Sequence, residues 1–478
     1  MKNKMKKIFL LLIGFSSTIL IISSCAVGPD FQKPQVDIPA QFMYDSLKID
    51  SVATLKWWDL FSDPILDSLV TTALKENKNL LIAVSRIEEA RANLGFTGAD
   101  QYPKLDIKGD AVRGNLNSKQ LGFDETNNSF FIGPVLSWEL DFWGKFRRAT
   151  ESARAQLLAS ESSLRTVQIS LITEVVSIYF QLLDYRERLN IAKNTLATRD
   201  KSLNIIKQRY EKGIIPEIDV NQSEIQREIA AASIPQFERL VAQTENALSI
   251  LLGKNPTRFE KVNPLHEQVI PPDIPPGLPS DLLARRPDVQ EAEFLLMSQN
   301  AKIGVAVAQR FPSISLTGIF GLASNDLSTL TDNGSAWSLS GGLLGPIFNF
   351  NKNIARVEIE EARTKQALYN YENTVLTAFK DVEDALIEVE TYKKQLASAE
   401  RQFKAAKNAE FLSQQRYDQG VTSYLEVLES QRSAFDAELQ LSVVKKDYLN
   451  AYVKLYKALG GGWISTQEME QSKKEITE

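Results

Sequence analysis

The sequence predicts a mainly α-helical chain with an internal two-fold repeat, whose few strands contribute to a membrane β-barrel. Three observations lead to this fold class. One set of motifs occurs twice, two long stretches carry heptad periodicity, and four short stretches alternate between apolar and small or polar residues. The chain has 478 residues, 43% hydrophobic and 24% charged, which suits a large ordered structure without a bias toward disorder.

The repeat is clearest in the motif Arg-Tyr-x-x-Gly. It begins at Arg209 and again at Arg416, and each copy is followed by an apolar-acidic-valine sequence. Tyr102-Pro103 and Phe311-Pro312 recur at nearly the same separation. Solenoid repeats have periods of roughly 20 to 50 residues. The longer period here therefore indicates two copies of one half-molecule.

These features divide the chain into six segments. The predicted segments are 1–24 (lipoprotein signal peptide), 25–79 (N-terminal lipid-anchored segment), 80–263 (first structural repeat), 264–279 (connector), 280–463 (second structural repeat) and 464–478 (polar C-terminal tail). The connector is rich in proline, which favours a rigid extended conformation.

The N-terminus has the pattern of an export signal. A lysine cluster precedes the apolar stretch 8–22, and small residues stand before Cys25, the only cysteine of the chain. That stretch is shorter than the roughly 20 residues of a membrane span. We expect a diacylglyceryl thioether on Cys25 and no other cofactor; ordinary signal cleavage is the alternative. Ala26 follows, so no aspartate retains the lipoprotein at the inner membrane.

Four stretches are predicted to be strands. They are 104–116, 130–142, 313–324 and 337–350. In the second of these, apolar residues alternate with smaller or polar neighbours at period two over its whole length, despite Pro134.

The longest stretches are predicted to be helices. A helical pattern runs over 80–97, another over 145–209, and a third over 218–252. At 1.5 Å rise per residue the second would be roughly 100 Å long. Gly213 and Pro216 predict a sharp turn after it.

Both halves carry an a/d seam along their longest helix. The seam positions are Leu171, Val175, Ile178, Leu182, Tyr185, Leu189, Ala192 and Leu196 in the first half, and Val375, Ala378, Val382, Ala385, Val389, Tyr392, Leu396, Ala399, Phe403 and Ala406 in the second. Heptad spacing of this length is typical of long packed helices, and the alanines permit close packing.

Four strands are too few for a closed membrane barrel, which needs at least about eight. Free strand edges would leave backbone amides unsatisfied in lipid. The chain is therefore expected to oligomerise and close its sheet with strands from other copies. An elongated periplasmic coiled coil with a small soluble sheet domain is the alternative.

Composition and motifs exclude several classes of function. Acidic residues (60) outnumber Lys and Arg (55), which argues against a nucleic acid partner. His266 is the only histidine, so we expect no transition-metal cluster. Phosphate loops, nucleophile elbows and acid/base pairs are not recognisable, so we predict no enzymatic activity and no catalytic residues.

Several motifs together resemble one family. They are Cys25-Ala26-Val27-Gly28-Pro29-Asp30-Phe31, Leu282-Leu283-Ala284-Arg285-Arg286-Pro287-Asp288-Val289, Phe311-Pro312, the doubled Arg-Tyr-x-x-Gly and Leu459-Gly460-Gly461-Gly462-Trp463. In this order and spacing they resemble the TolC-like outer-membrane efflux factors, specifically the NodT-type lipoprotein branch. The resemblance covers the chain from Cys25 to about Trp463.

The resemblance implies a homotrimer in the outer membrane of a Gram-negative bacterium. Four strands from each protomer would close a twelve-stranded barrel, and the long helices would form a periplasmic tunnel. The implied partners are a periplasmic adaptor and an inner-membrane pump, commonly of the resistance-nodulation-division type. The implied function is a passive exit duct for small molecules. A periplasmic scaffold lipoprotein and a protein-secretion duct are the alternatives.

The resemblance also implies a gate at the periplasmic tip. By position in the family motif, Leu425 and Glu429 would constrict the tunnel, with Tyr424 beside them. Three Glu429 carboxylates about 8 Å apart would repel by roughly 0.5 kcal/mol per pair in water; a solvated helix carboxylate is the alternative reading of this residue. The turns expected to contact the adaptor contain Gly213, Ile214, Gly420 and Val421. Asp418 argues against transferring a specific tip salt bridge from relatives.

Two paired motifs are interpreted as structural. Arg285-Arg286 precedes Pro287-Asp288, which the family places at the start of a helix; proline and an acid suit its first turn. Trp57-Trp58 is expected to anchor the N-terminal segment to the helical body.

Overall fold

The computed structural model describes residues 26–44, 61–114, 126–260, 262–271, 279–332 and 335–461. The predictions for 1–24, Cys25, Trp57-Trp58, Trp463 and the polar tail, and for residues 272–278 of the connector, lie outside these residues. In the described part of the connector, Leu265–Glu267 forms a 3-10 turn, so the prediction of an extended conformation was wrong there. The chain forms two compact units. The strand unit comprises Met1–Gln35, Arg86–Glu161 and Glu291–Glu372, and the helical unit comprises Val36–Ser85, Ser162–Gln290 and Asn373–Glu478.

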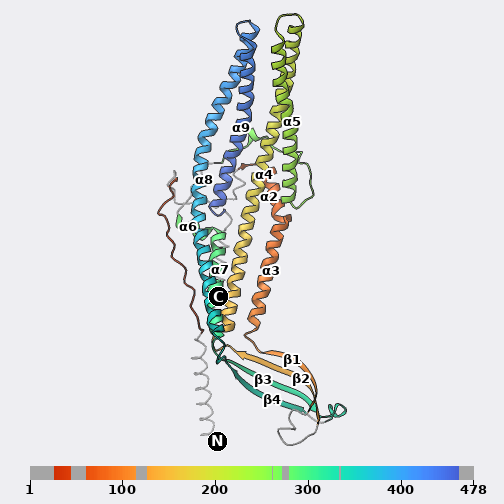
Figure 1. Ribbon diagram of the computed structural model, residues 1–478, viewed down its shortest axis with the longest axis vertical. Coiled ribbons are helices and arrows are strands. Elements are labelled where there is room, and N and C mark those ends of the chain that lie inside the picture. The colour runs from red at the N-terminus through yellow and green to blue at the C-terminus, as the bar shows by residue number, and fades with distance from the viewer. Residues whose placement is uncertain are drawn as a thin grey trace. The chain divides into compact units, whose positions relative to one another are not determined.

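The strand unit contains a four-stranded antiparallel sheet in the order β1-β2-β3-β4 (Figure 1). The strands are β1 Lys104–Gly114, β2 Asn127–Leu140, β3 Ser313–Ser324 and β4 Ser335–Leu344. All four predicted strands are therefore present. β4 ends earlier than predicted, and this part of the prediction was wrong for 345–350. Gly345 and Pro346 break the alternation, and Phe350 and Asn351 have positive φ values of 50° and 65°, which no strand continues.

Proline inside β2 is accommodated by a local gap in the pairing. Pro134 has a partner in β1, Ile107, but its pairing with β3 is interrupted between Ile132 and Val135. A Cβ on the neighbouring Gly133 would lie only 2.2 Å from the Phe320 carbonyl oxygen, so only glycine permits this approach. The strand therefore keeps its direction without the N–H that proline lacks.

The two halves of the chain contain long helices of equal length. The described helices are α2 Pro64–Glu76, α3 Lys78–Ala99, α4 Lys145–Glu211, α5 Glu217–Leu251, α6 Pro279–Arg285, α7 Pro287–Ala308, α8 Lys352–Asp418 and α9 Tyr424–Ala458, with 3-10 turns at Leu265–Glu267 and Leu327–Thr329. α4 and α8 each have 67 residues, and α5 and α9 each have 35. The order helix, two strands, long helix, shorter helix thus occurs twice along the chain.

The two long hairpins turn at the glycines singled out by the sequence. Gly213 has φ +70° and Gly420 has φ +73°, a conformation that favours glycine. At the first turn the Gly213 N–H donates to the Tyr210 carbonyl and the Ile214 N–H to the Arg209 carbonyl. The second turn repeats both bonds. This pair of bonds ends a helix in the Schellman motif, so the repeated sequence encodes the turn itself.

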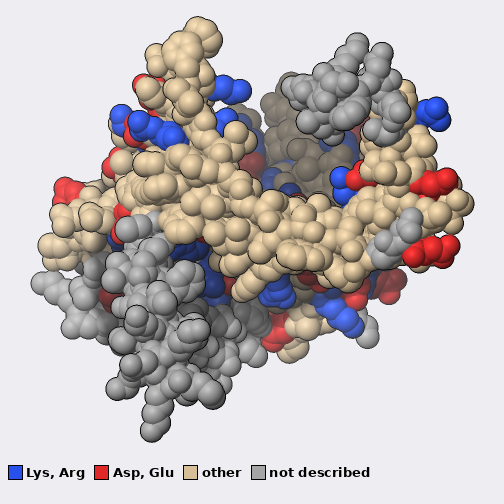
Figure 2. Space-filling view, turned by 90° about the horizontal axis from the view of Figure 1, so that it is seen from below, with Lys and Arg blue, Asp and Glu red and all other residues tan. Residues whose placement is uncertain are grey.

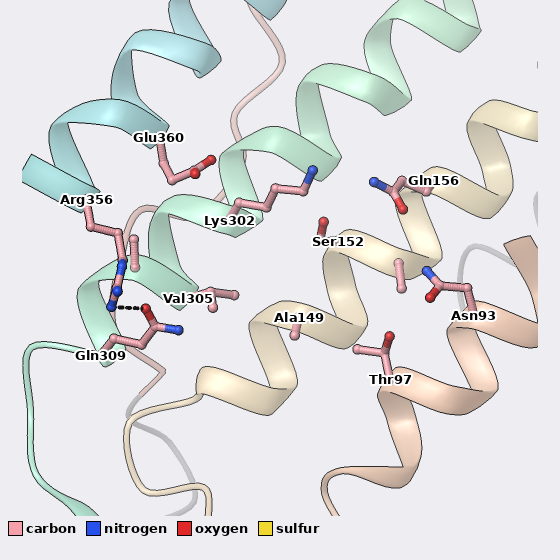
Figure 3. Close-up of a pocket in the computed structure, with 12 residues that line it drawn as sticks. Asn93, Thr97, Ala149, Ser152, Gln156, Lys302, Val305, Gln309, Arg356 and Glu360 are labelled. Carbon is pink, nitrogen blue, oxygen red and sulfur yellow. Dashed lines mark hydrogen bonds between the residues drawn. The ribbon is translucent and has the colours of Figure 1, made fainter. Parts of the chain in front are cut away.

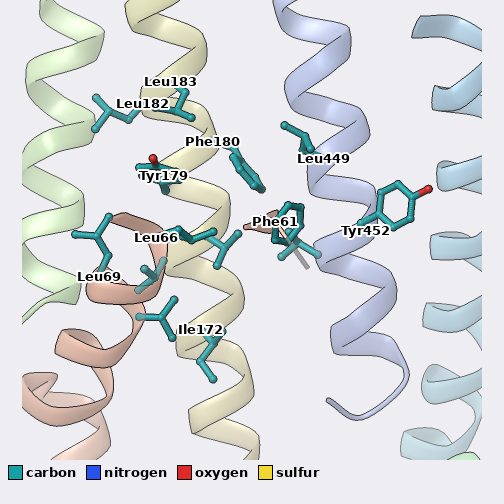
Figure 4. Packing of buried hydrophobic residues seen from close by; sticks show 14 of the residues in the cluster. Phe61, Leu66, Leu69, Ile172, Tyr179, Phe180, Leu182, Leu183, Leu449 and Tyr452 are labelled. Carbon is teal, nitrogen blue, oxygen red and sulfur yellow. The ribbon is translucent and has the colours of Figure 1, made fainter. Parts of the chain in front are cut away.

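The core of the helical unit lies where α2 meets α4 and α9 (Figure 4). Phe61 packs edge-on against Phe180, with ring centroids 5.0 Å apart. The predicted seam is part of this core, since Leu171, Val175 and Leu182 are all buried. α4 is also the one described helix long and apolar enough to cross a membrane. Half of that stretch is buried in the protein, which is the behaviour of a core helix.

The Arg285-Arg286 motif is structural, as predicted. α7 begins at Pro287, and the buried Arg286 donates to Asp288 at 2.6 Å and to Asp381 of α8 at 3.1 Å. Its Nη1 also donates to the Ala458 carbonyl at the end of α9. The guanidinium therefore joins the start of one helix to two others, and its donors are occupied within the chain.

Candidate functional site

The sheet has one apolar face. Strand register places the odd residues of β1 and β4 on the same face as the even residues of β2 and β3. This face carries Leu105, Ile107, Ala111, Phe130, Ile132, Pro134, Leu136, Trp138, Leu140, Ile314, Leu316, Phe320, Leu322, Trp337, Leu339 and Leu343. Ile107 is 82% exposed and Leu339 77% exposed, so this chain alone leaves the face uncovered.

The opposite face holds most of the polar residues of the sheet. It carries Lys104, Asp106, Lys108, Asp110, Ser137, Glu139, Ser313, Ser315, Thr317, Ser338 and Ser340. In the view of Figure 2, uncharged residues make up most of the coloured surface. A sheet that is apolar on one face and polar on the other has the pattern of a barrel wall between lipid and water.

Both outer strands have a free edge. β1 pairs only with β2, and β4 pairs only with β3, within the part of the chain that the structure describes. Free edges on an apolar sheet need a pairing partner.

The segment after Cys25 is held against the strand unit. The Val27 N–H donates to the Trp143 carbonyl at 3.1 Å, and Arg148, whose side chain is 7% exposed, pairs with Asp30 at 2.6 Å. A Cβ on Gly28 would lie 2.5 Å from the Gly304 Cα, so the segment lies directly on the backbone of α7. These contacts fix the residues next to the expected lipid attachment point.

The aromatic residues at the start of α4 support this contact. Trp143 stacks on Phe311 with ring centroids 4.5 Å apart and donates from Nε1 to the Pro312 carbonyl at 2.8 Å. The Phe311-Pro312 motif of the sequence therefore forms the junction between α7 and β3.

The predicted gate residues lie at the start of α9 but in different environments. Leu425 is 60% exposed. Glu429 is exposed and pairs with Arg432 of the same helix at 2.7 Å. Tyr424 is buried, and its hydroxyl donates to Ser223 of α5 at 3.1 Å. Leu425 and Glu429 are thus free to face another molecule, whereas Tyr424 joins the two hairpins.

Contacts between the hairpins at the tip were missed by the sequence reasoning. Arg209 of α4 lies 3.4 Å from Asp418 of α8, and its guanidinium lies 5.0 Å from the centre of the Tyr417 ring. The sequence interpretation of Asp418 concerned only the transfer of a tip salt bridge from relatives, and it did not foresee this ion pair within the chain. The two motif copies supply both sides of this contact, a signal that was present in the sequence but needed the hairpins to be placed side by side.

A small apolar cluster lies beside these contacts. Its buried members are Leu203, Ile206, Val220, Tyr424, Val427 and Leu428. The turns themselves expose apolar side chains: Ile214 is 66% exposed and Val421 is 64% exposed. Exposed apolar residues on a turn are suited to contact with another protein.

The described residues contain no group of three or more His, Cys, Asp or Glu side chains placed to hold a metal ion. His266 is largely exposed, with Nδ1 3.4 Å from Glu187.

Comparison with known proteins decides the family. The model of the outer membrane efflux protein family matches residues 69–254 and 278–461, one match in each half. The chain belongs to this family. The resemblance drawn from the sequence motifs is confirmed.

Family relatives match over nearly their whole length. The chain is 37% identical over 461 residues to the solvent efflux pump outer membrane protein SrpC of Pseudomonas putida, covering 94% of this chain and 98% of the relative. It is 35% identical over 456 residues to the probable outer membrane lipoprotein SilC of Salmonella typhimurium, covering 94% and 98%. The open-state crystal structure of the Neisseria gonorrhoeae MtrE outer membrane channel matches with a TM-score of 0.82 and 30% identity, covering 92% and 98%.

Members of this family are outer-membrane efflux channels, and the chain is one of them. The outer-membrane location and the transport function predicted from the motifs are therefore confirmed. A periplasmic scaffold without a pore does not fit this family.

Proposed function

We propose that the chain is one protomer of a homotrimeric exit duct in the outer membrane. The observation that supports this most strongly is the sheet, which is apolar on one face, polar on the other and free at both edges. Three copies would supply twelve strands, each β1 pairing with a neighbour's β4. Closure would satisfy every edge amide and turn the apolar face to lipid.

The helices would continue the barrel as a periplasmic tunnel. We interpret the two halves as copies of one unit, because helix lengths and element order repeat and the family model matches each half. With such a duplication, a trimer has six quasi-equivalent sectors around its axis. The seam residues pack the helices within each sector, and the polar sides face water.

Lipid on Cys25 would add a second attachment to the membrane after removal of residues 1–24. The contacts of Val27, Gly28 and Asp30 with the strand unit support this, because they hold the chain next to Cys25 beside the sheet. No further cofactor is proposed.

The partners would be a periplasmic adaptor and, through it, an inner-membrane pump of the resistance-nodulation-division type. Ile214 and Val421, with Gly213 and Gly420, would form the adaptor contact. The pump would supply the energy, so the duct itself would conduct passively and catalyse no reaction. Small-molecule cargo is favoured over secreted proteins by the small-molecule efflux relatives such as the solvent pump component SrpC.

The gate would lie at the start of α9. Leu425 would form an apolar constriction, and Glu429 a ring of three carboxylates around the axis. The pairing of Glu429 with Arg432 reduces the net charge of that ring in each protomer. Tyr424 would act indirectly, by holding α9 against α5.

Planar-bilayer conductance tests the duct and its gate together. The purified native protein should give small, mostly closed currents, and Leu425→Ala/Glu429→Ala should open them. Tyr369→Ala serves as the control, because this residue is 64% exposed and lies on α8 some 49 residues before the end of the helix at Asp418. No conductance from any of these well-folded trimers would contradict the duct, whereas equal conductance from native and double-variant protein would contradict the gate alone.

A further inference from the structure

The strand unit contains a hollow of about 360 Å³ on one face of the layer formed by α3, α4, α7 and α8 (Figure 3). It is lined by Asn93, Thr97, Ala149, Ser152, Ala153, Gln156, Lys302, Val305, Ala306, Gln309, Arg356 and Glu360. Its volume lies within the roughly 300 to 1,000 Å³ of small-molecule sites. None of the residues that the family resemblance implied for the gate or for adaptor docking lines this hollow.

Two cations line the hollow without an acidic partner. Lys302 makes no hydrogen bond or ion pair with any residue that the structure describes. Arg356 donates only to the neutral side chains of Gln309, at 2.6 Å, and Asn353, at 3.5 Å. Both cations are half-buried, so their field in the hollow is screened less than that of fully solvated charges.

The one acid of the lining is already neutralised. Glu360 accepts hydrogen bonds from Arg363 at 2.7 Å and from Gln299 at 2.5 Å. The hollow therefore has a net positive charge. The wall between the polar groups is apolar and includes Ala149, Ala153 and Val305.

A second hollow continues from the first toward the sheet. It has a volume of about 480 Å³, and it shares Gln309 and Arg356 with the first. Glu139 and Ser313, which belong to the polar face of the sheet, also line it. Arg356, which lines both hollows, thus connects the first hollow with Glu139 and Ser313 of the polar face.

We propose that the first hollow binds the anionic group of a small cargo molecule, a carboxylate, phosphate or sulfonate attached to an apolar part. This inference rests on the proposed duct, because it requires the polar face to line the conducting path. In a trimer, three copies of Lys302 and of Arg356 would surround that path. A unit charge about 8 Å from an ion raises the local anion concentration about twofold even in water.

Ion selectivity provides the first test. Reversal potentials are measured under a KCl gradient in the Leu425→Ala/Glu429→Ala background, with and without Lys302→Gln/Arg356→Gln. These two added substitutions should lower the chloride-to-potassium permeability ratio about twofold or more. Glu360→Gln should raise the ratio. Lys365→Gln, half a turn around α8 from Arg356 and exposed, should leave it unchanged.

Binding of a defined probe provides the second test. Hexanoate has the proposed chemistry, and hexyltrimethylammonium has the same chain with the opposite charge. Hexanoate should reduce the current through the background channel, and this block should be lost in Lys302→Gln/Arg356→Gln. The ammonium probe should block both channels equally.

The outcomes separate this inference from the duct itself. Conductance with an unchanged permeability ratio and unchanged hexanoate block would overturn the anion site and leave the duct standing. If Lys302→Gln/Arg356→Gln no longer runs as a trimer on unheated gels and its selectivity is unchanged, the two cations serve subunit contact. This result would also overturn the anion site. Absence of current from every protein would overturn the duct and, with it, this inference.

Discussion

Arg209 lies 3.4 Å from Asp418, although the two residues belong to different helical hairpins. Each comes from one copy of the Arg-Tyr-x-x-Gly motif, at the last turn of α4 and of α8. The Tyr417 ring lies beneath the same guanidinium at 5.0 Å. Movement of one tip away from the other must therefore break an ion pair and a ring contact.

Asp418→Asn should make the tip easier to open. The pair is partly exposed, so its loss is expected to cost about 0.2 to 1 kcal/mol, which would raise the open population at most about fivefold. Single-channel recording measures this as an increased open probability. Glu211→Gln removes a negative charge near the same turn and should have no effect. Equal open probabilities for native protein and Asp418→Asn would mean that this contact does not restrain the tip.

A charge on the apolar face of β4 should prevent membrane insertion. Leu339→Lys places a cation where we propose lipid, at about 2 to 4 kcal/mol per chain near the bilayer centre. Ser338→Lys is its control, because the neighbouring residue lies on the opposite face. Heat-modifiable trimers in outer-membrane fractions should be lost for Leu339→Lys only. If both variants insert equally, the assignment of the faces is wrong.

Arg148→Ala should release the segment that follows Cys25. The substitution removes the ion pair with Asp30 and the weaker hydrogen bond to the Val27 carbonyl, together about 2 kcal/mol of local stability. Chymotrypsin should then cut after Phe31 roughly thirty times faster, given about 1.4 kcal/mol per tenfold change. Arg154→Ala, an exposed position on the same helix, should be cut at the native rate. Unchanged cleavage in Arg148→Ala would show that other contacts hold the segment.

Asp184→Asn should change how stability depends on pH. Burial raises the pKa of Asp184 above its ordinary value of 3.8, against the opposing hydrogen bond from Ser442 and the charge of Arg188. A carboxyl with a raised folded-state pKa is protonated more readily in the folded protein, so native stability falls as pH rises from about 4 through the raised pKa.

The Asn variant lacks this titration and should not show that fall. Melting temperatures of native protein and Asp184→Asn, compared from pH 4 to pH 8, measure the difference. Asp200→Asn, at a partly exposed position on the same helix, serves as the control. A native protein whose stability rises across this range relative to Asp184→Asn would contradict the sign of the shift.

Local sequence patterns predicted the secondary-structure elements and their repetition. Heptad spacing along Leu171 to Leu196 specified a long helix because apolar residues at that period can be buried only on one helical stripe. Gly213 and Gly420 predicted the turns, because a turn that needs a positive φ is most easily formed by glycine, which has no Cβ. The end of β4 was misplaced because the apolar residues Ile347, Phe348 and Phe350 continue beyond the strand, and period-two patterning carries no information on backbone angles.

Which residues contact one another became visible only from the packing of the folded chain. Strand register assigned the polar and apolar faces, because pairing fixes the side of each residue across all four strands. Hairpin packing buried Tyr424 but left Leu425 exposed, although they are neighbours in sequence. It also brought Arg209 to Asp418, and Lys302 and Arg356 to one hollow. Such contacts join residues far apart in the chain, where local periodicity carries no information about distance.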